Sequence, residues 1–440
     1  MLLLCSYSCF CILQEDPLST YLDEASVYNT RAYPTYFGTI DDEENEFEPI
    51  FRNLINYETE ISALQQPDQV GSPATSVKMV NVDDYEAKGD GIDDTEAFKK
   101  AWKAACSSSS PAVLVVPHYK NYLLKPITFS GPCRFDLTLM VYGTIEASDD
   151  RAHYKRDRRH WLVFENIQNL IVEGGGTING NGNIWWQNSC KINKKLALTF
   201  LECKNLLVRN LNIKNSQQMH VAFQNCVNVQ AFNLMITAPG NSPNTDGIHV
   251  TGTKNILIMT CVIKTGDDCI SIVSGSSKVQ ASDITCGPGH GISIGSLGAG
   301  NQEAHVSDVM VDRARLSGTT NGVRIKTWQG GSGSANNIIF QNIIMYNVKN
   351  PIIIDQNYCD QDEPCKEQKS AVQVKQVMYK NIKGTSASEV AMKFDCSKNI
   401  PCLGILLQDI NLVREGGGTA TASSENVKYI QIGRVSPAFS

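Results

Sequence analysis

The feature of this 440-residue chain that most constrains its fold is a short recurring unit, a polar corner followed by a run of β-forming residues. The unit occupies residues 204–208, 227–231, 254–258 and 336–340. A strand-rich coil that closes about every 20 to 30 residues lays each turn about 4.8 Å above the last, so residues one period apart become neighbours. Helical periodicity is almost absent after Cys106. The pattern predicts an all-β fold, a single-stranded right-handed parallel β-helix (solenoid).

Asparagines stand at these polar corners. In stacked coils, an asparagine at a repeated bend usually bonds backbone groups of the neighbouring turns. We therefore expect Asn205, Asn228 and Asn255 to be structural residues rather than ligands.

The first part of the chain differs from the rest. Residues 1–20 start with an apolar stretch, too short for a bilayer helix of about 20 residues, and predict a signal peptide. Residues 21–77 are acidic and irregular, which indicates a propeptide-like extension before the β-helix domain at 78–440. Residues 1–77 hold 13 of the 45 acidic residues but two of the 39 basic ones, so residues 78–440 carry about +5.

A cationic body would attract a polyanion, and the acidic extension either screens that charge or only assists solubility and folding. Nucleic acid is a poor candidate partner, because the basic residues are dispersed and form no recognised binding motif. We expect a monomer with no membrane association in its mature form.

Cysteine usage favours a secreted protein. Fifteen cysteines are many for a reducing compartment. Close spacing favours three disulfide pairs, Cys269–Cys286, Cys359–Cys365 and Cys396–Cys402. Zinc is the alternative, but the chain lacks paired CxxC or Cys/His spacings, and we expect no metal and no cofactor.

Four motifs that carry chemistry recur at similar steps: Asn244-Thr245-Asp246, Gly266-Asp267-Asp268, Gly289-His290-Gly291 and Arg324-Ile325-Lys326. The steps from Asp246 to Asp267 and from Asp268 to His290 are 21 and 22 residues. Stacked coils would gather these side chains on one face. Taken alone, two aspartates after a glycine are more often a solvated turn, and a lone histidine is usually a surface residue.

Three carboxyl groups close together suit the cleavage of a glycosidic bond. That reaction needs an acid for the departing oxygen and a carboxylate that activates water or attacks the sugar. Repulsion among like charges pushes at least one carboxyl group toward its protonated form. Arg324 and Lys326 lie two apart on a strand and face the same way, with Ile325 inward. The two cations form either an ion-pair network or a site for a substrate carboxylate. Tyr358 would extend the stack by one coil, as a sugar contact or a buried structural residue.

In this order the four motifs resemble the signatures of polygalacturonases, glycoside hydrolase family 28. The longer runs 242–247, 286–295 and 321–328 are similar to those of the plant branch, particularly the fruit-type endo-acting enzymes. The resemblance covers about residues 79–415. It implies hydrolysis of α-1,4-linked galacturonic acid in homogalacturonan (pectin), with inversion and without metal, by an enzyme of the cell wall or apoplast.

The resemblance also implies residue roles. Asp267 would be the general acid, and Asp246 and Asp268 would activate the water. His290 would support the acid or bind sugar. The substrate-binding residues would be Asn244, Arg324, Lys326 and Tyr358. One departure concerns folding: Glu86 stands where a glycine is commoner, and a positive φ there would strain the backbone.

Several alternatives stay open. A pectate lyase shares the coil architecture but uses calcium and eliminates rather than hydrolyses. A noncatalytic wall-binding protein would bind the polysaccharide without releasing reducing ends. Among hydrolases, an exo-acting enzyme or one acting on rhamnogalacturonan or xylogalacturonan is the nearest rival. The cationic pair at 324 and 326 favours plain galacturonate, whereas endo or exo action depends on loops that the sequence does not define.

Overall fold

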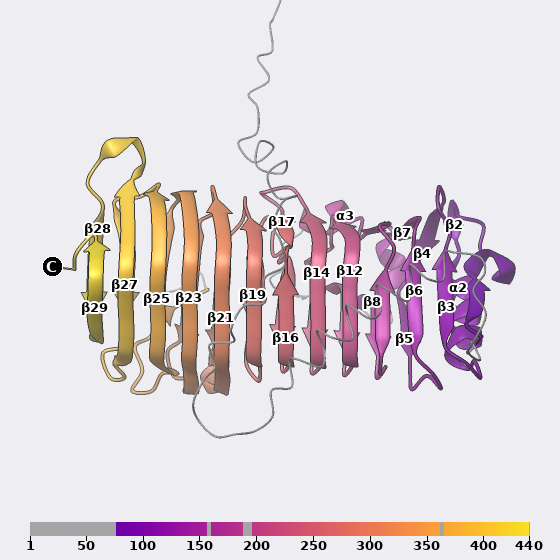
Figure 1. The fold of residues 1–440 in the computed structure, drawn as a ribbon, viewed down its shortest axis with the longest axis horizontal. Helices are drawn as coiled ribbons and strands as arrows, with labels where there is room; N and C mark the ends of the chain where they lie inside the picture. The colour runs from indigo at the N-terminus through magenta and orange to yellow at the C-terminus, as the bar shows by residue number, and fades with distance from the viewer. Residues whose placement is uncertain (1–75, 156–159, 188–195, 361–364, 440) are drawn as a thin grey trace, which may run out of the picture. The chain divides into compact units, whose positions relative to one another are not determined.

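The computed structural model describes residues 76–155, 160–187, 196–360 and 365–439. The signal peptide predicted for residues 1–20 lies outside the described residues, as does almost all of the extension predicted for 21–77. The described part of residues 78–440 is a stack of parallel strands joined by turns and loops (Figure 1).

The described strands form two sheets of eighteen and eleven strands. The first sheet contains β1 (Lys78–Asn81), β2 (Asp90–Asp93), β3 (Ala112–Val116), β4 (Asn121–Leu124), β6 (Leu137–Val141), β7 (Thr144–Ala147), β9 (Leu170–Glu173), β10 (Thr177–Asn179), β12 (Lys204–Lys214), β14 (Val227–Thr237), β16 (Lys254–Met259), β17 (Val262–Lys264), β19 (Ser277–Cys286), β21 (Glu303–Ser317), β23 (Ser332–Val348), β25 (Gln373–Ser386), β27 (Cys402–Arg414) and β29 (Val427–Ser436). The second contains β5 (Ile127–Ser130), β8 (His160–Glu165), β11 (Leu196–Leu201), β13 (Met219–Gln224), β15 (Ile248–Thr251), β18 (Ile270–Ile272), β20 (Ile292–Leu297), β22 (Asn321–Trp328), β24 (Asn350–Tyr358), β26 (Val390–Asp395) and β28 (Thr421–Glu425).

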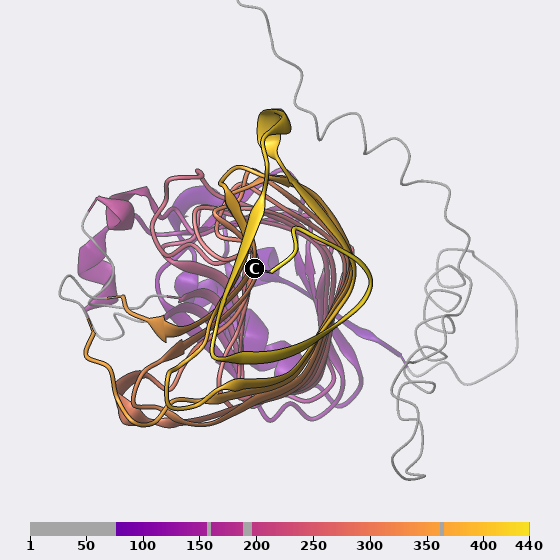
Figure 2. The ribbon, with the colours of Figure 1, turned by 90° about the vertical axis from the view of Figure 1, so that its left-hand side faces the viewer.

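Helices are few among the described residues. They are α2 (Thr95–Cys106), α3 (Asn183–Trp186) and the 3₁₀ turns η3 (Val82–Tyr85), η4 (Arg151–Tyr154), η5 (Ala299–Asn301) and η6 (Glu415–Gly417). Strands one coil apart pair in parallel along both sheets, and the coils superpose in a view along the stack (Figure 2). The predicted right-handed parallel β-helix is confirmed.

The core consists of equivalent side chains stacked coil upon coil. Strand register aligns Ile248, Ile270, Ile292, Val323 and Ile352, and all five are fully buried. A second column, of buried rings, lies on the preceding coils, with centroids 5.3 and 5.4 Å apart for the pairs Phe164–Phe200 and Phe200–Phe223. Burial of apolar area contributes about 25 cal/mol per Å², so each such column adds much to the stability of the fold. The columns also fix the strand register, because a slip of one residue would expose them to solvent.

The corner asparagines form a ladder. The Nδ2 amide of Asn205 donates to Asn169 Oδ1 at 3.0 Å, Asn228 donates to Asn205 at 3.0 Å, and Asn255 donates to Asn228 at 2.8 Å. These residues have φ between 52° and 59°, a region that asparagine tolerates better than most residues. The structural role is confirmed. The expected partner was wrong, because the amides bond each other rather than the backbone of neighbouring coils.

Helix α2 covers the interior of the first coils. Its buried face carries Phe98, Ala101 and Trp102, and the Trp102 ring packs 4.8 Å from Phe129. The last residue of α2, Cys106, forms a disulfide with Cys133. Without such a cover, the open end of the solenoid would expose the apolar columns to water.

Four disulfides are present among the described residues, and three of them are the predicted pairs Cys269–Cys286, Cys359–Cys365 and Cys396–Cys402. The described free cysteines are Cys203, Cys226 and Cys261, all buried. Within the described ranges, no helix has the length and apolar character needed to cross a bilayer.

Glu86 provides a test of backbone strain. It follows η3 with φ of 76°, and its side chain forms an exposed ion pair with Lys100. We expect Glu86→Gly to melt about 1–3 °C above Glu86→Ala, because only glycine adopts this φ without a steric penalty. Both variants lose the ion pair, so the alanine variant is the control for it. Equal melting temperatures by circular dichroism would show that the position is unstrained.

Candidate active site

The four motifs meet on the second sheet, where β15, β18, β20 and β22 begin. Asp246 precedes β15, Asp268 precedes β18 and His290 precedes β20, while Arg324 and Lys326 lie within β22. Because these strands are successive neighbours in register, their first residues lie on adjacent coils. The predicted convergence is confirmed, and Ile325 is buried in the core as expected.

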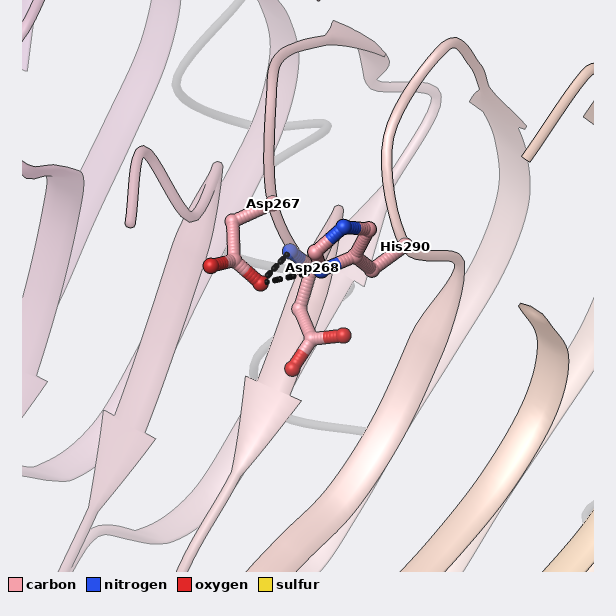
Figure 3. Close-up of side chains that lie close together, drawn as sticks. All are labelled: Asp267, Asp268 and His290. Atoms are coloured by element: carbon pink, nitrogen blue, oxygen red, sulfur yellow. Dashed lines mark hydrogen bonds and ion pairs between the residues drawn. The ribbon is translucent and has the colours of Figure 1, made fainter. Parts of the chain in front are cut away.

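Asp267 is the most accessible of the three aspartates, with 16% of its side chain exposed. Its Oδ1 atom lies 2.8 Å from Nδ1 of His290 and accepts a 2.8 Å bond from the Asp268 amide (Figure 3). Its Oδ2 atom accepts a 3.4 Å bond from Nδ2 of Asn244. The bond with Asp267 raises the pKa of His290 above its ordinary value. The structure therefore brings Asn244 and His290 to the carboxylate assigned as the acid.

Asp268 is an ionised carboxylate held by two cations. It is 1% exposed; Oδ1 accepts bonds from Arg324 Nη2 and Ser293 Oγ at 2.8 Å, and Oδ2 accepts from Lys326 Nζ at 2.9 Å. Burial acts to raise the pKa of Asp268, but the charges of Lys326 and Arg324 and these hydrogen bonds together lower it below its ordinary value. The ion-pair network considered from the sequence is thus present, built around one aspartate.

Asp246 has a different environment. It is 7% exposed, and its Oδ2 atom accepts a 2.6 Å hydrogen bond from Ser271 Oγ. Burial, followed by the negative charges of Asp267 and Asp268, raises the pKa of Asp246 well above its ordinary value. The carboxyl group that we expected to be pushed toward its protonated form is therefore Asp246, with burial as a larger cause than the crowding of like charges.

Three residues of the site escaped the sequence reasoning. His220 is fully buried, its backbone amide donates to the Asp246 carbonyl at 2.8 Å, and its Nδ1 lies 3.0 Å from the same oxygen. Desolvation lowers the pKa of His220 to about 4, so the ring is neutral and fixes the backbone of Asp246. Ser271 and Ser293 orient the carboxylates of Asp246 and Asp268.

Tyr358 lies on the next coil, as expected. Strand register pairs it with Trp328, and the two rings meet edge to face with centroids 5.4 Å apart. The Lys326 ammonium lies 5.4 Å from the centre of the Tyr358 ring. At that distance the ring attracts the ammonium group and limits the directions in which the remaining N–H bonds of Lys326 can point.

One row of side chains connects the site with more distant coils. These residues alternate with core residues and share one register position, so they face away from the core. The outward row comprises Thr128, Val163, Thr199, Ala222, His249, Ser271, Ser293 and Arg324. A hollow of about 380 Å³ lies at its far end, lined by Thr128, Val163 and the basic side chains of His153, Lys155 and His160 among others.

Three side chains of the site could offer ligand atoms to a metal ion. One ligand atom from each of Asp267, Asp268 and His290 lies within 4.8 Å of the others. Both oxygens of Asp268 already accept bonds from Arg324 and Lys326, whose positive charges would repel a metal ion. The arrangement suits acid–base chemistry better than metal binding.

Comparison with known proteins places the chain in a family. Residues 106–436 match Glycosyl hydrolases family 28. The chain belongs to this family. It is 58% identical over 432 residues to a polygalacturonase of Persea americana, covering 96% of this chain and 92% of that protein. A polygalacturonase of Malus domestica is 58% identical over 428 residues, covering 94% and 90%. The family resemblance inferred from the four motifs is confirmed.

Solved structures agree on the fold of this family 28 chain. An endo-xylogalacturonan hydrolase from Aspergillus tubingensis superposes with a TM-score of 0.71, covering 80% of this chain and 96% of that one. Its sequence identity is 22%, so the likeness shows the shared β-helix and nothing about the substrate.

The contact between His290 and Asp267 predicts a pH-dependent contribution to stability. Since the pKa of His290 is raised in the folded protein, the contribution is complete below the unfolded pKa of about 6.5 and is lost as pH rises through the folded pKa. We expect His290→Gln to lower the free energy of unfolding more at pH 5 than at pH 8.5, by less than about 1 kcal/mol because 41% of the side chain is exposed. Urea unfolding measures this. His305→Gln, an exposed histidine paired with Glu303, is the control, and equal losses for His290→Gln at both pH values would contradict the prediction.

Proposed function

We propose that this protein is a polygalacturonase that hydrolyses α-1,4-galacturonosyl linkages within homogalacturonan, by endo action and with inversion. The observation that carries the proposal is the meeting of three carboxyl groups, an imidazole and two cations on one face of a family 28 β-helix. Relatives named polygalacturonase, at 58% identity over nearly their whole length, support the substrate class.

Each carboxyl group receives a role from its environment. Asp267, the most exposed, protonates the glycosidic oxygen, and His290 holds it in position. Asp268, ionised by its two cations, accepts a proton from the attacking water. Asp246 assists in activating that water when it is ionised. The sugar lies against Asn244 on one side and Tyr358 on the other.

Water attack, rather than direct attack by a carboxylate, fits the surroundings of Asp268. An oxygen of Asp267 lies within 4.8 Å of an oxygen of Asp268, less than the roughly 6.5–9.5 Å usual for inverting enzymes. A nucleophile, however, needs a free oxygen, and both Asp268 oxygens hold bonds from cations in a side chain that is 2% exposed. We therefore favour inversion, which proton NMR would detect as initial release of the β-anomer.

The same two cations suit a galacturonate carboxylate. Arg324 uses Nε and Nη2 for Ser293 and Asp268, which leaves Nη1 for a ligand. Lys326 donates one proton to Asp268 and retains two. The net charge of about +5 on residues 78–440 adds long-range attraction to a polyanion.

Endo action is proposed because the motifs resemble those of the fruit-type endo-acting enzymes. A hollow lined by Thr128 and Val163 lies on the same sheet, four and three strands from β15. At about 4.8 Å per strand, its distance from the site corresponds to several sugar units. Exo action and a xylogalacturonan or rhamnogalacturonan substrate remain the rival hypotheses, and a lyase would instead release unsaturated, ultraviolet-absorbing products.

We also propose that the protein acts as a monomer outside the cell, in the wall that contains its substrate. Four disulfides support this location, because such bonds persist mainly in oxidising compartments. The absence of nucleic-acid partners stays a prediction.

The acid role of Asp267 has a direct test. We expect Asp267→Asn to lower kcat on polygalacturonate about a thousandfold, because the amide cannot donate a proton to the leaving oxygen. Release of reducing ends measures this, and an unchanged melting curve confirms folding. Asp283→Asn, which removes an exposed ion pair with Arg313, is the matched control. Retained turnover in the Asp267 variant would refute the role.

Endo action predicts a chain-length effect. We expect the wild type to lower the viscosity of polygalacturonate early, while few bonds are broken. Lys155→Ala should raise KM for the polymer about threefold, the size of one exposed charge contact, and leave KM for trigalacturonate unchanged. Lys204→Ala, an exposed lysine on the first sheet, is the control. Monomer as the only early product would contradict endo action.

A further inference from the structure

Two short hydrogen bonds link Asp246 to a histidine outside the motifs. Ser271 Oγ donates to Asp246 Oδ2 at 2.6 Å, and Nδ1 of His249 lies 2.7 Å from the same Oγ. Strand register places His249 and Ser271 side by side in the outward row, on β15 and β18. Ser271 is 2% exposed and His249 is half-buried.

The serine hydroxyl has a single proton, and this fixes the state of its neighbours. When Ser271 donates to an ionised Asp246, Nδ1 of His249 must carry a proton and donate to Oγ. When Asp246 is protonated, it donates to Oγ, and Ser271 donates to a bare Nδ1. The two arrangements differ by a concerted shift of protons along the same two hydrogen bonds.

We propose that His249 is a positioning residue that takes the proton of Asp246 through Ser271, and so supplies the ionised Asp246 that water activation requires. In this step the proton on Asp246 Oδ2 passes to Ser271 Oγ as the hydroxyl proton of Ser271 passes to His249 Nδ1. The products are a carboxylate and an imidazolium, and no other reactant is needed. This inference rests on the proposed function.

The surroundings of Asp246 explain why such a partner is needed. The side chain is buried and faces the negative charges of Asp267 and Asp268, and all three factors raise its pKa. The positive charge of Lys326 lowers that pKa by a smaller amount. Arg324 and Lys326 bond to Asp268 instead. An opposite charge within about 4–6 Å typically lowers a carboxyl pKa by one or more units, and two hydrogen bonds place the imidazolium in that range.

Two uncharged residues stand beside His249 on the neighbouring strands. On the strands described on either side of β15, the residues beside it are Ala222 and Ser271, and neither is charged. Farther along the outward row lie Thr199 on one side and Ser293 and Arg324 on the other. The charged groups that face Asp246 are Asp267, Asp268 and Lys326.

The relay also suits repeated turnover. An inverting base gains a proton from water in every cycle and must lose it before the next. Asp246 is too buried to exchange that proton readily with bulk water, whereas the half-buried imidazole lies nearer the surface of the fold. In cycles in which Asp246 rather than Asp268 takes up that proton, His249 serves as its exit.

The test is the pH dependence of kcat/KM for His249→Asn and Ser271→Ala on polygalacturonate. Asparagine keeps an N–H donor for Ser271 but cannot take a proton, and alanine removes the bridge. Without the imidazolium, Asp246 stays protonated to higher pH, so we expect the acidic limb of both profiles to move up by about one pH unit. Well above that limb, His249→Asn should largely retain its activity, whereas Ser271→Ala also loses the bond that orients Asp246. His305→Asn, an exposed histidine on β21, is the control and should leave the limb in place.

A second readout does not depend on activity. Infrared difference spectra against Asp246→Asn isolate the protonated carboxyl band of Asp246. That band should persist to higher pH in His249→Asn, by the same shift. An unmoved limb and band, with changes only in KM or stability, would overturn the relay and leave His249 a structural residue. A wild type that titrates as described but hydrolyses no polygalacturonate would refute the proposed function and not the relay.

Discussion

The site depends on one constraint, the fixed register of parallel strands one coil apart. Hydrogen bonding between the strands sets a spacing of about 4.8 Å, and the buried columns through Ile270 and Ile292 prevent a slip of one residue. Side chains separated by 22 residues in sequence are therefore adjacent in space. The serine or cation that bonds to a carboxylate therefore lies on a neighbouring coil, and no long loop is needed to bring the two together.

This register places three chemically identical groups in three environments. Asp268 bonds to Arg324 and Lys326 and is ionised, whereas the Asp246 carboxyl group is buried beside like charges and accepts a bond from a hydroxyl. Asp267 is the most exposed of the three, with an imidazole and an amide as partners. Differences in solvation and neighbouring charge, rather than in residue type, thus give the three aspartates separate roles as one acid and two bases.

Much of the fold and the site was readable from the sequence, because repeats and motifs report register directly. The outward row was readable too: Ile248-His249-Val250, Ile270-Ser271-Ile272 and Ile292-Ser293-Ile294 each place one polar residue between two core residues. We missed it because serine between apolar residues is common and carries no chemistry by itself. His220 gave no signal, since its contact with Asp246 depends on the path of a turn. The raised pKa of Asp246 also could not be predicted from the sequence, because it depends on how deeply the side chain is buried and on which carboxylate the cations pair with.

The cationic pair links recognition to chemistry. Arg324 and Lys326 hold Asp268 ionised in the free protein, and under the proposed function they also bind the substrate carboxylate. A second anion shares their positive charge, so its arrival weakens their hold on Asp268 and raises its proton affinity. Asp268 is then a stronger base when galacturonate is bound than when the groove is empty. A neutral sugar would leave the cations fully engaged with Asp268, so discrimination between substrates would appear in the rate of the chemical step as well as in affinity.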